Sequence, residues 1–109
     1  MKKIYRIRKN EEFSRIIEEK HSTASASFVL YYSNKKEENA RVGISVSKKL
    51  GDAVDRNRIK RQVREMAKAT IDFENESKDI VIIVRQGYLK NDYQDNLSNL
   101  DKLLKKAII

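Results

Sequence analysis

The chain has 109 residues, of which 24 are Lys or Arg and 16 are Asp or Glu, so its formal net charge is +8 at pH 7. This length predicts one domain, residues 1–109. The absence of cysteine excludes disulfides and thiolate zinc sites, and it fits a reducing, cytoplasmic location. No run approaches the roughly 18 apolar residues of a membrane span, and the basic start lacks the apolar stretch of a secretory signal, so we expect no membrane partner.

The positive charge is concentrated in part of the chain. Residues 48–64 contain seven basic and two acidic residues, a net charge of +5, whereas residues 65–109 contain seven and eight, a net charge of −1. A surface that only keeps a protein soluble would spread its charge more evenly. The focused excess indicates a polyanion as partner.

The N-terminal part predicts a basic arm and then a helix. The arm, Lys2 to Lys9, holds five basic residues and no acidic one. Asn10 is expected to be the N-cap of a helix that ends near Lys20, because two glutamates follow it where the helix dipole favours acids. Its apolar face has helical spacing and consists of Phe13, Ile16 and Ile17.

Two strands are expected next, from Ser27 to Tyr32 and from Arg41 to Ser47, with a polar turn over residues 34–39. The second strand alternates clearly. Its apolar set needs a core, and its other set is small and polar, which leaves space for something to lie on that face. The two sets are Val42, Ile44 and Val46, and Gly43, Ser45 and Ser47.

The second half predicts helix, strand and helix. Asp55 is expected to cap a helix from Arg56 to about Ile71, and Asp79 to Arg85 is expected to be a strand covered on both faces. Asn91 is expected to cap the last helix, with Gln94 in the reciprocal capping position. The apolar stripes of the two helices are Ile59, Val63, Met66, Ala67 and Thr70, and Tyr93, Leu97, Leu100, Leu103 and Leu104.

The order of elements predicts the fold class. A helix between the strands at residues 41–47 and 79–85 suggests a βαβ unit. We therefore expect an α+β sandwich built around one sheet.

The inventory of reactive side chains argues against an enzyme active site in this chain. The single histidine, His21, is expected to be an ordinary polar residue, and the adjacent glutamate pairs do not share a helix face. Asp52 and Asp55 flank Gly51, where turn and capping roles explain them. No metal-ligand cluster, phosphate loop or dinucleotide fingerprint is present, so we expect no catalytic residue and no metal or cofactor bound by the protein alone.

The strongest signal is a stripe of cations on the central helix. Arg56, Lys60 and Arg64 follow one another at intervals of four residues, with Asn57 and Arg61 on the adjoining edge. Three like charges in a row cost a few tenths of a kcal/mol per pair in an isolated helix. Neutralising phosphates would offset that cost, and a solvated basic face is the alternative explanation.

Aromatic residues give a second signal. Tyr31 falls on the opposite strand face from Phe28, Leu30 and Tyr32. One of the two faces must be core, and an aromatic left on an open sheet face beside basic side chains would stack on single-stranded RNA. Both interpretations of these rings remain open from the pattern alone.

The segment from Lys48 to Glu65 resembles the signature of the bacterial ribonuclease P protein component. It contains Arg-Asn-Arg at residues 56–58, followed by Ile-Lys-Arg-x-x-Arg-Glu. The resemblance extends to Asn-Glu-Glu-Phe, Phe-Val-Leu-Tyr, Arg-Val-Gly-Ile-Ser-Val-Ser-Lys-Lys and Asp-Ile-Val-Ile-Ile-Val-Arg in the expected order, and so covers nearly the whole chain.

This resemblance implies a two-layer α/β sandwich like that of ribosomal protein S5 domain 2, with a left-handed βαβ crossover. Handedness statistics alone predict the right-handed form. It also implies a role as accessory subunit of an endoribonuclease. In this family a large catalytic RNA subunit uses magnesium ions to cleave precursor tRNA at its 5′ end.

The resemblance also assigns two groups of residues. Those expected to bind the catalytic RNA are Lys48, Lys49, Arg56, Asn57, Arg58, Lys60, Arg61 and Arg64. Those expected in a cleft for the 5′ leader of precursor tRNA are Phe13, Ile17 and Tyr31. Some relatives have an aromatic where this chain has Ile17, so apolar contact is expected there. A structural ribosomal protein is the alternative function, and a protein-only nuclease is disfavoured by the missing acidic cluster.

Overall fold

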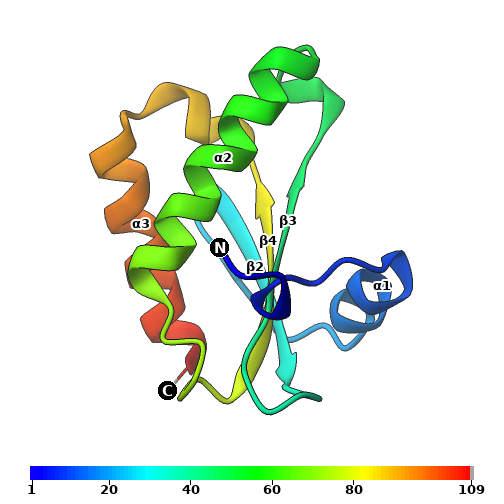
Figure 1. Ribbon diagram of the computed structural model, residues 1–109. Helices are drawn as coiled ribbons and strands as arrows, with labels where there is room; N and C mark the ends of the chain where they lie inside the picture. The colour runs from blue at the N-terminus through cyan, green and yellow to red at the C-terminus, as the bar shows by residue number, and fades with distance from the viewer. Residues whose placement is uncertain (109) are drawn as a thin grey trace.

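The computed structural model describes residues 1–108, which form a four-stranded sheet with helices on both of its faces (Figure 1). The three helices are α1 (Asn10–Glu18), α2 (Ala53–Thr70) and α3 (Tyr93–Ile108). The four strands are β1 (Ser22–Ala24), β2 (Phe28–Asn34), β3 (Val42–Val46) and β4 (Lys78–Val84). Short 3-10 helices cover Lys3–Tyr5, Lys48–Leu50 and Gln86–Lys90. Within residues 1–108, no helix is both long enough and apolar enough to cross a membrane.

The strands lie in the order β1-β2-β4-β3, and β3 is an edge strand. β2 pairs antiparallel with β1 and β4, whereas β3 pairs parallel with β4. Because β3 and β4 are parallel neighbours, α2 has to cross over between them. Helices α2 and α3 cover one face of the sheet, and α1 lies against the other face (Figure 1).

The β3-α2-β4 crossover is left-handed: from the face that carries α2, with the strands pointing up, the chain moves leftwards from β3 to β4 (Figure 1). Most parallel connections are right-handed, so this feature was implied by the family resemblance and not by general statistics. The sheet with α2 and α3 forms the expected two-layer α+β sandwich. Helix α1 adds a partial cover on the second face.

The core has two parts, one on each face of the sheet. The larger part lies beneath α2 and α3, and the smaller part lies beneath α1. The α1 face of the sheet contributes Val81, which is fully buried, and Tyr31, which is partly buried. Since β4 is covered from both sides, its residues from Asp79 to Ile82 are all buried, as its continuous apolar sequence predicts.

All three expected helix caps are wrong by one to three residues. Asn10 is the first residue of α1 and Lys9 is its N-cap, without a capping side chain. α2 begins after Asp52, whose carboxylate accepts from the N–H of Asp55 at 2.9 Å, while the carboxylate of Asp55 accepts from the N–H of Asp52 at 3.4 Å. At α3 the carboxylate of Asp92, not Asn91, accepts a helix N–H, from Asp95 at 2.8 Å.

The strands differ from the prediction mainly at their ends. β2 runs two residues past Tyr32, and β4 begins one residue before Asp79. β1 was not predicted, because three residues are too few for an alternating pattern to stand out. Tyr93, expected on the apolar face of α3, is 37% exposed.

Two ion pairs attach α1 to the edge of the sheet through the buried residues Arg41 and Asp79. The guanidinium of Arg41 lies 2.6 Å from the carboxylate of Glu12 on α1 and 3.1 Å from that of Asp79 on β4. Asp79 is fully buried and also accepts the backbone N–H of Arg41 at 3.0 Å. Removing one partner of such a group leaves an uncompensated buried charge, so these ions fix where α1 stands on the sheet.

Candidate nucleic-acid interface

The basic arm at the N-terminus lies across β3. The N–H of Ile7 donates to the carbonyl of Val42 at 2.9 Å, and the buried side chain of Ile7 joins the core beneath α1. Further back, the ring of Tyr5 stacks on Phe73 with 4.5 Å between centroids, and its hydroxyl donates to Glu74 at 2.7 Å. Because Tyr5 and Ile7 are both anchored, the backbone of Arg6 between them is held beside β3.

The cation stripe of α2 lies on the side of the helix that faces β3 and the arm. Ile59 and Val63 are buried in the core and set the rotation of the helix. That rotation leaves Arg56, Lys60 and Arg64 partly buried. The structure therefore places the three cations beside the edge of the sheet.

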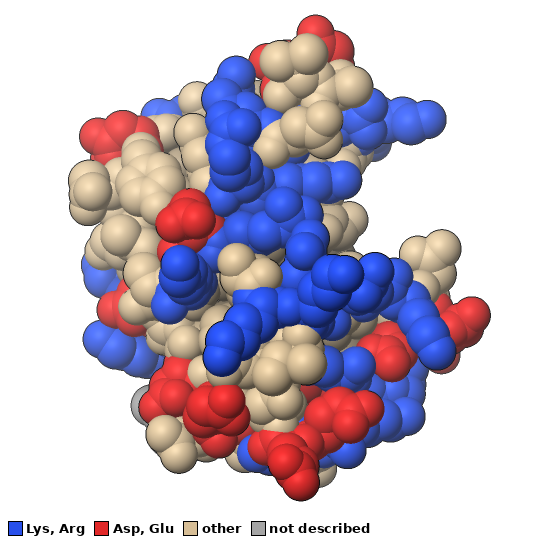
Figure 2. Space-filling model, viewed as in Figure 1, with Lys and Arg blue, Asp and Glu red and all other residues tan. Residues whose placement is uncertain are grey.

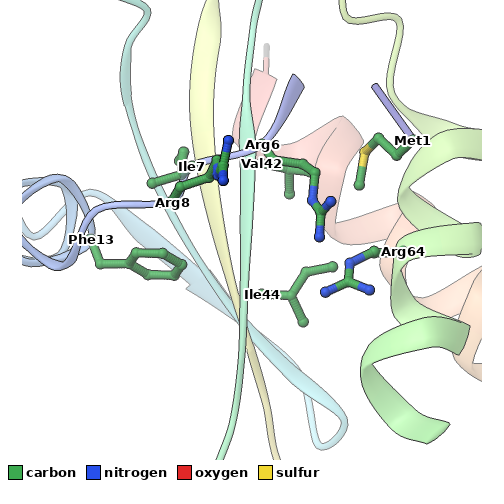
Figure 3. Close-up of a pocket in the computed structure, with 8 residues that line it drawn as sticks. All are labelled: Met1, Arg6, Ile7, Arg8, Phe13, Val42, Ile44 and Arg64. Carbon is green, nitrogen blue, oxygen red and sulfur yellow. The ribbon is translucent and has the colours of Figure 1, made fainter. Parts of the chain in front are cut away.

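The first of two hollows lies where the arm crosses β3, and Figure 3 shows its side chains. Arg6 and Arg8 come from the arm, Phe13 from α1, Ile44 from β3 and Arg64 from α2, around a volume of about 280 Å³. Among residues 1–108, no acidic residue lines this hollow. Burial, and then the charge of Arg6, lower the pKa of Arg64. An anion placed between these guanidinium groups would relieve their repulsion.

The second hollow follows directly along β3 and has a volume of about 390 Å³. Phe13 and Ile17 of α1 form one wall, and Lys60 of α2 contributes the single charge. The remaining lining is apolar or neutral and consists of Asn10, Ser14, Ile44, Ser45 and Val46. An apolar wall facing a single cation suits a ligand with a flat apolar part and an anionic part, such as a nucleotide.

Tyr31 lies farther from these hollows than expected. On the α1 face of the sheet it stands in one row with Val81 and Gly43, two strands away from β3. It is partly buried and packs in the small core beneath α1, together with Phe13 and Ile17. The three expected cleft residues thus belong to one cluster, but only two of them line a hollow.

The other expected RNA-binding residues lie outside the hollows. Asn57, Arg58 and Arg61 are exposed on α2, and Arg58 forms an ion pair with Asp55 at 3.3 Å. Lys48 and Lys49 are exposed in the 3-10 helix that leads from β3 to α2. Arg56 is partly buried near the start of α2 and lines neither hollow.

The surface of the molecule joins these cations into one region. Figure 2 shows Lys and Arg side chains in a band over α2 and the N-terminal segment, with a hollow opening towards α1. Acidic side chains gather mostly at the opposite end of this face, below the band. We call the two hollows together the groove.

Sequence reasoning missed part of the groove. Arg6 and Arg8 belong to the predicted basic arm, but nothing in the local sequence places them beside Arg64, 58 and 56 residues later in the chain. Ile44 was expected in the core, yet it is only partly buried because β3 is an edge strand. In the described residues, no three His, Cys, Asp or Glu side chains come together as metal ligands do.

The fold and the groove define a small, basic α+β protein of the nucleic-acid-binding kind, with its cations gathered beside one edge of the sheet. The family model for ribonuclease P matches residues 1–108. The ribonuclease P protein component of Streptococcus pyogenes serotype M5 is 41% identical over 107 residues, which cover 98% of this chain and 89% of that protein.

Solved structures give the same result. The RNase P protein of Staphylococcus aureus superposes with a TM-score of 0.82 at 44% identity, covering 94% of both chains. The RNase P protein of Thermotoga maritima superposes with a TM-score of 0.79 at 31% identity, covering 93% of this chain and 96% of that one. The chain therefore belongs to the ribonuclease P protein family and is a protein subunit of that enzyme. The resemblance read from the sequence is confirmed.

Proposed function

We propose that this subunit uses its two cationic surfaces for two different RNAs. The groove between α1 and α2 binds the 5′ leader of precursor tRNA, and the outer side of α2, with Lys48 and Lys49, binds the catalytic RNA. The observation that carries the proposal is the second hollow, where Lys60 of α2 faces Phe13 and Ile17 of α1. A leader is single-stranded, so its bases are free to contact an apolar wall while its phosphates meet cations.

The division follows from the shape of each surface. The groove is narrow and partly apolar, which suits one extended strand. The outer side of α2 is exposed and hydrophilic, which suits the broad phosphate backbone of a folded RNA. This assignment separates residues that the sequence alone left in one group.

The chemistry of cleavage belongs, in this proposal, to the RNA. The catalytic RNA uses magnesium ions to hydrolyse the phosphodiester bond at the 5′ end of the tRNA, and this chain supplies binding and orientation with no catalytic residue. Endonuclease activity is then a property of the assembled ribonucleoprotein. The proposed substrate, precursor tRNA, places the protein in the cytoplasm.

Reconstitution tests the proposal. The purified protein is mixed with its cognate RNA at low and at high magnesium, and cleavage of precursor tRNA is followed at the 5′ end. We expect the protein to promote cleavage most strongly at low magnesium, where its cations replace part of the missing counterions. Cleavage by the protein without RNA, or an RNA that gains nothing from the protein, would contradict it.

A further inference from the structure

Gly43 stands in the middle of β3 without a backbone reason to be glycine. It is paired in register with Val81 of β4, and its φ is not in the left-handed region, where Gly51 lies. Glycine inside a strand weakens it, because it has no side chain to pack and loses the most freedom on folding. Its surroundings must therefore explain its presence.

The ring of Phe13 occupies the space of the missing side chain. A Cβ atom on Gly43 would lie 2.5 Å from Cζ of Phe13, 2.7 Å from Cε1 and 3.2 Å from Cε2. The first two distances are shorter than real carbon contacts. The tip of the ring thus rests on the backbone of β3, a position that only glycine permits.

The same ring forms part of both hollows of the groove, the first of which is shown in Figure 3. The first hollow is also lined by Arg6, Arg8 and Arg64, and the second is also lined by Ile17 and Lys60. The position of the ring decides how far the hollow with three arginines lies from the hollow with Ile17 and Lys60. A ring pushed off the strand would shift that boundary and narrow the groove.

We infer that Gly43 is a positioning residue for leader recognition: it seats Phe13 so that the ring divides the groove into a phosphate compartment and a base compartment at a fixed spacing. This inference rests on the proposed function of the groove. Gly43 touches no RNA itself and acts through Phe13.

The first test is the Gly43→Ala variant in the reconstituted holoenzyme. The preference for precursor over mature tRNA, measured as a ratio of dissociation constants, is expected to fall about fivefold, the size of a weak stacking contact. Affinity for the catalytic RNA is expected to stay the same. Gly87→Ala is the matched control, because its Cβ would also clash, 2.2 Å from the carbonyl oxygen of Ala26, but Gly87 lines neither hollow of the groove. An equal loss of preference in both variants would overturn the inference.

A second measurement needs no RNA and tests whether Gly43 provides the space for the Phe13 ring, which we call the seat of the ring. Leucine lacks the Cε and Cζ atoms that the new Cβ would meet, so Phe13→Leu should relieve the clash. Gly43→Ala is expected to lower the thermal midpoint by about 4–8 °C in the wild-type background and not at all in the Phe13→Leu background. Equal lowering in both would mean that the methyl group disturbs β3 itself, which would refute the seat.

The two measurements separate the possible failures. A wild-type holoenzyme without preference for precursor tRNA would refute the proposed function, while the midpoints would still report on the seat. A confirmed seat with an unchanged tRNA preference in Gly43→Ala would instead overturn the positioning role. If Gly43→Ala does not fold alone, a folded double variant, Phe13→Leu with Gly43→Ala, would still confirm the seat, and a double variant that also fails to fold would refute it.

Discussion

α2 carries cations on two sides, and the two sides differ in burial and in pairing. On the groove side, Arg56, Lys60 and Arg64 are partly buried, and within residues 1–108 none of them forms an ion pair. On the outer side, Arg58 and Arg61 are exposed, and Arg58 already pairs with Asp55. The same residue types on one helix thus meet two different environments.

This difference has a consequence for recognition. A partly buried cation without an acidic partner is screened less by solvent than an exposed one, so it attracts an anion more strongly. An exposed and paired cation contributes less and adapts to many partners. The groove side should therefore select its ligand, whereas the outer side should add affinity with little selectivity.

The largest expected effect comes from removing the groove-side charges. Replacing Arg56, Lys60 and Arg64 by Gln should weaken precursor tRNA binding by about 3 kcal/mol, roughly 150-fold, at about 1 kcal/mol for each charge-assisted contact. The fold should persist, because the core residues Ile59 and Val63 are unchanged. Binding of precursor tRNA to the reconstituted holoenzyme measures the effect, and circular dichroism checks the fold.

The matched control replaces Arg58 and Arg61 by Gln on the outer side. This variant should lower the affinity for the catalytic RNA and leave the preference for precursor over mature tRNA unchanged. If the two variants behave alike, the comparison between the two sides of α2 fails and the helix acts as one uniform basic surface.

The comparison also shows what the sequence determines about the fold. Patterns of burial specify the elements well: apart from the partly buried Ile83 and Thr70, the apolar run of β4 and the stripe of α2 lie in the core as predicted. Helix starts were predicted poorly, because several acidic or polar residues compete for one capping position. Asp52, not Asp55, is the N-cap of α2, because the chain turns at Gly51, whose φ is 141°. Asp55 lies at the third helical position and completes the capping box.

The candidate site was predictable only where its signal is local. The cations of α2 stand four residues apart, so the sequence itself places them on one side of a helix. The groove depends on contacts between distant segments, and no periodicity reports that the arm crosses β3 next to Arg64. The contact between Phe13 and Gly43 has the same origin, because it requires α1 to be fixed at the sheet edge by Arg41.

A smaller effect is expected at Tyr31, which lies on β2, two strands away from β3. Tyr31→Ala should reduce the preference for precursor over mature tRNA by roughly 5- to 150-fold, because stacking of one base is worth about 1–3 kcal/mol. Affinity for the catalytic RNA should barely change, since α2 is intact. The ratio of the two dissociation constants in folded protein is the measurement. An unchanged ratio, or an equal loss of both affinities, would make Tyr31 a structural residue of the small core beneath α1.

The smallest expected effect is on the salt dependence of RNA binding, and it gives the sharpest comparison between the two sides of α2. If about five phosphates are neutralised on duplex-like RNA, the logarithm of the association constant for the catalytic RNA should fall with a slope of roughly −4 to −5 in log salt, taking the coefficient of duplex DNA as a guide. A slope near zero would exclude an electrostatic interface. This measurement needs only the protein and the RNA.

The groove-side triple variant then tells the two surfaces apart. Its slope for the catalytic RNA should match that of the wild type, because the outer side of α2 is unchanged. Its slope for precursor tRNA, measured in the holoenzyme, should be shallower by about 2, since each lost contact to a single strand removes about 0.7. A shallower slope for the catalytic RNA instead would mean that Arg56, Lys60 and Arg64 contact the catalytic RNA. The leader would then be bound by the apolar wall of the groove without these three cations. The slope shows which RNA the three cations contact more reliably than the affinity does. A variant with a weakened fold binds less tightly at every salt concentration, but the number of counterions released on binding stays the same.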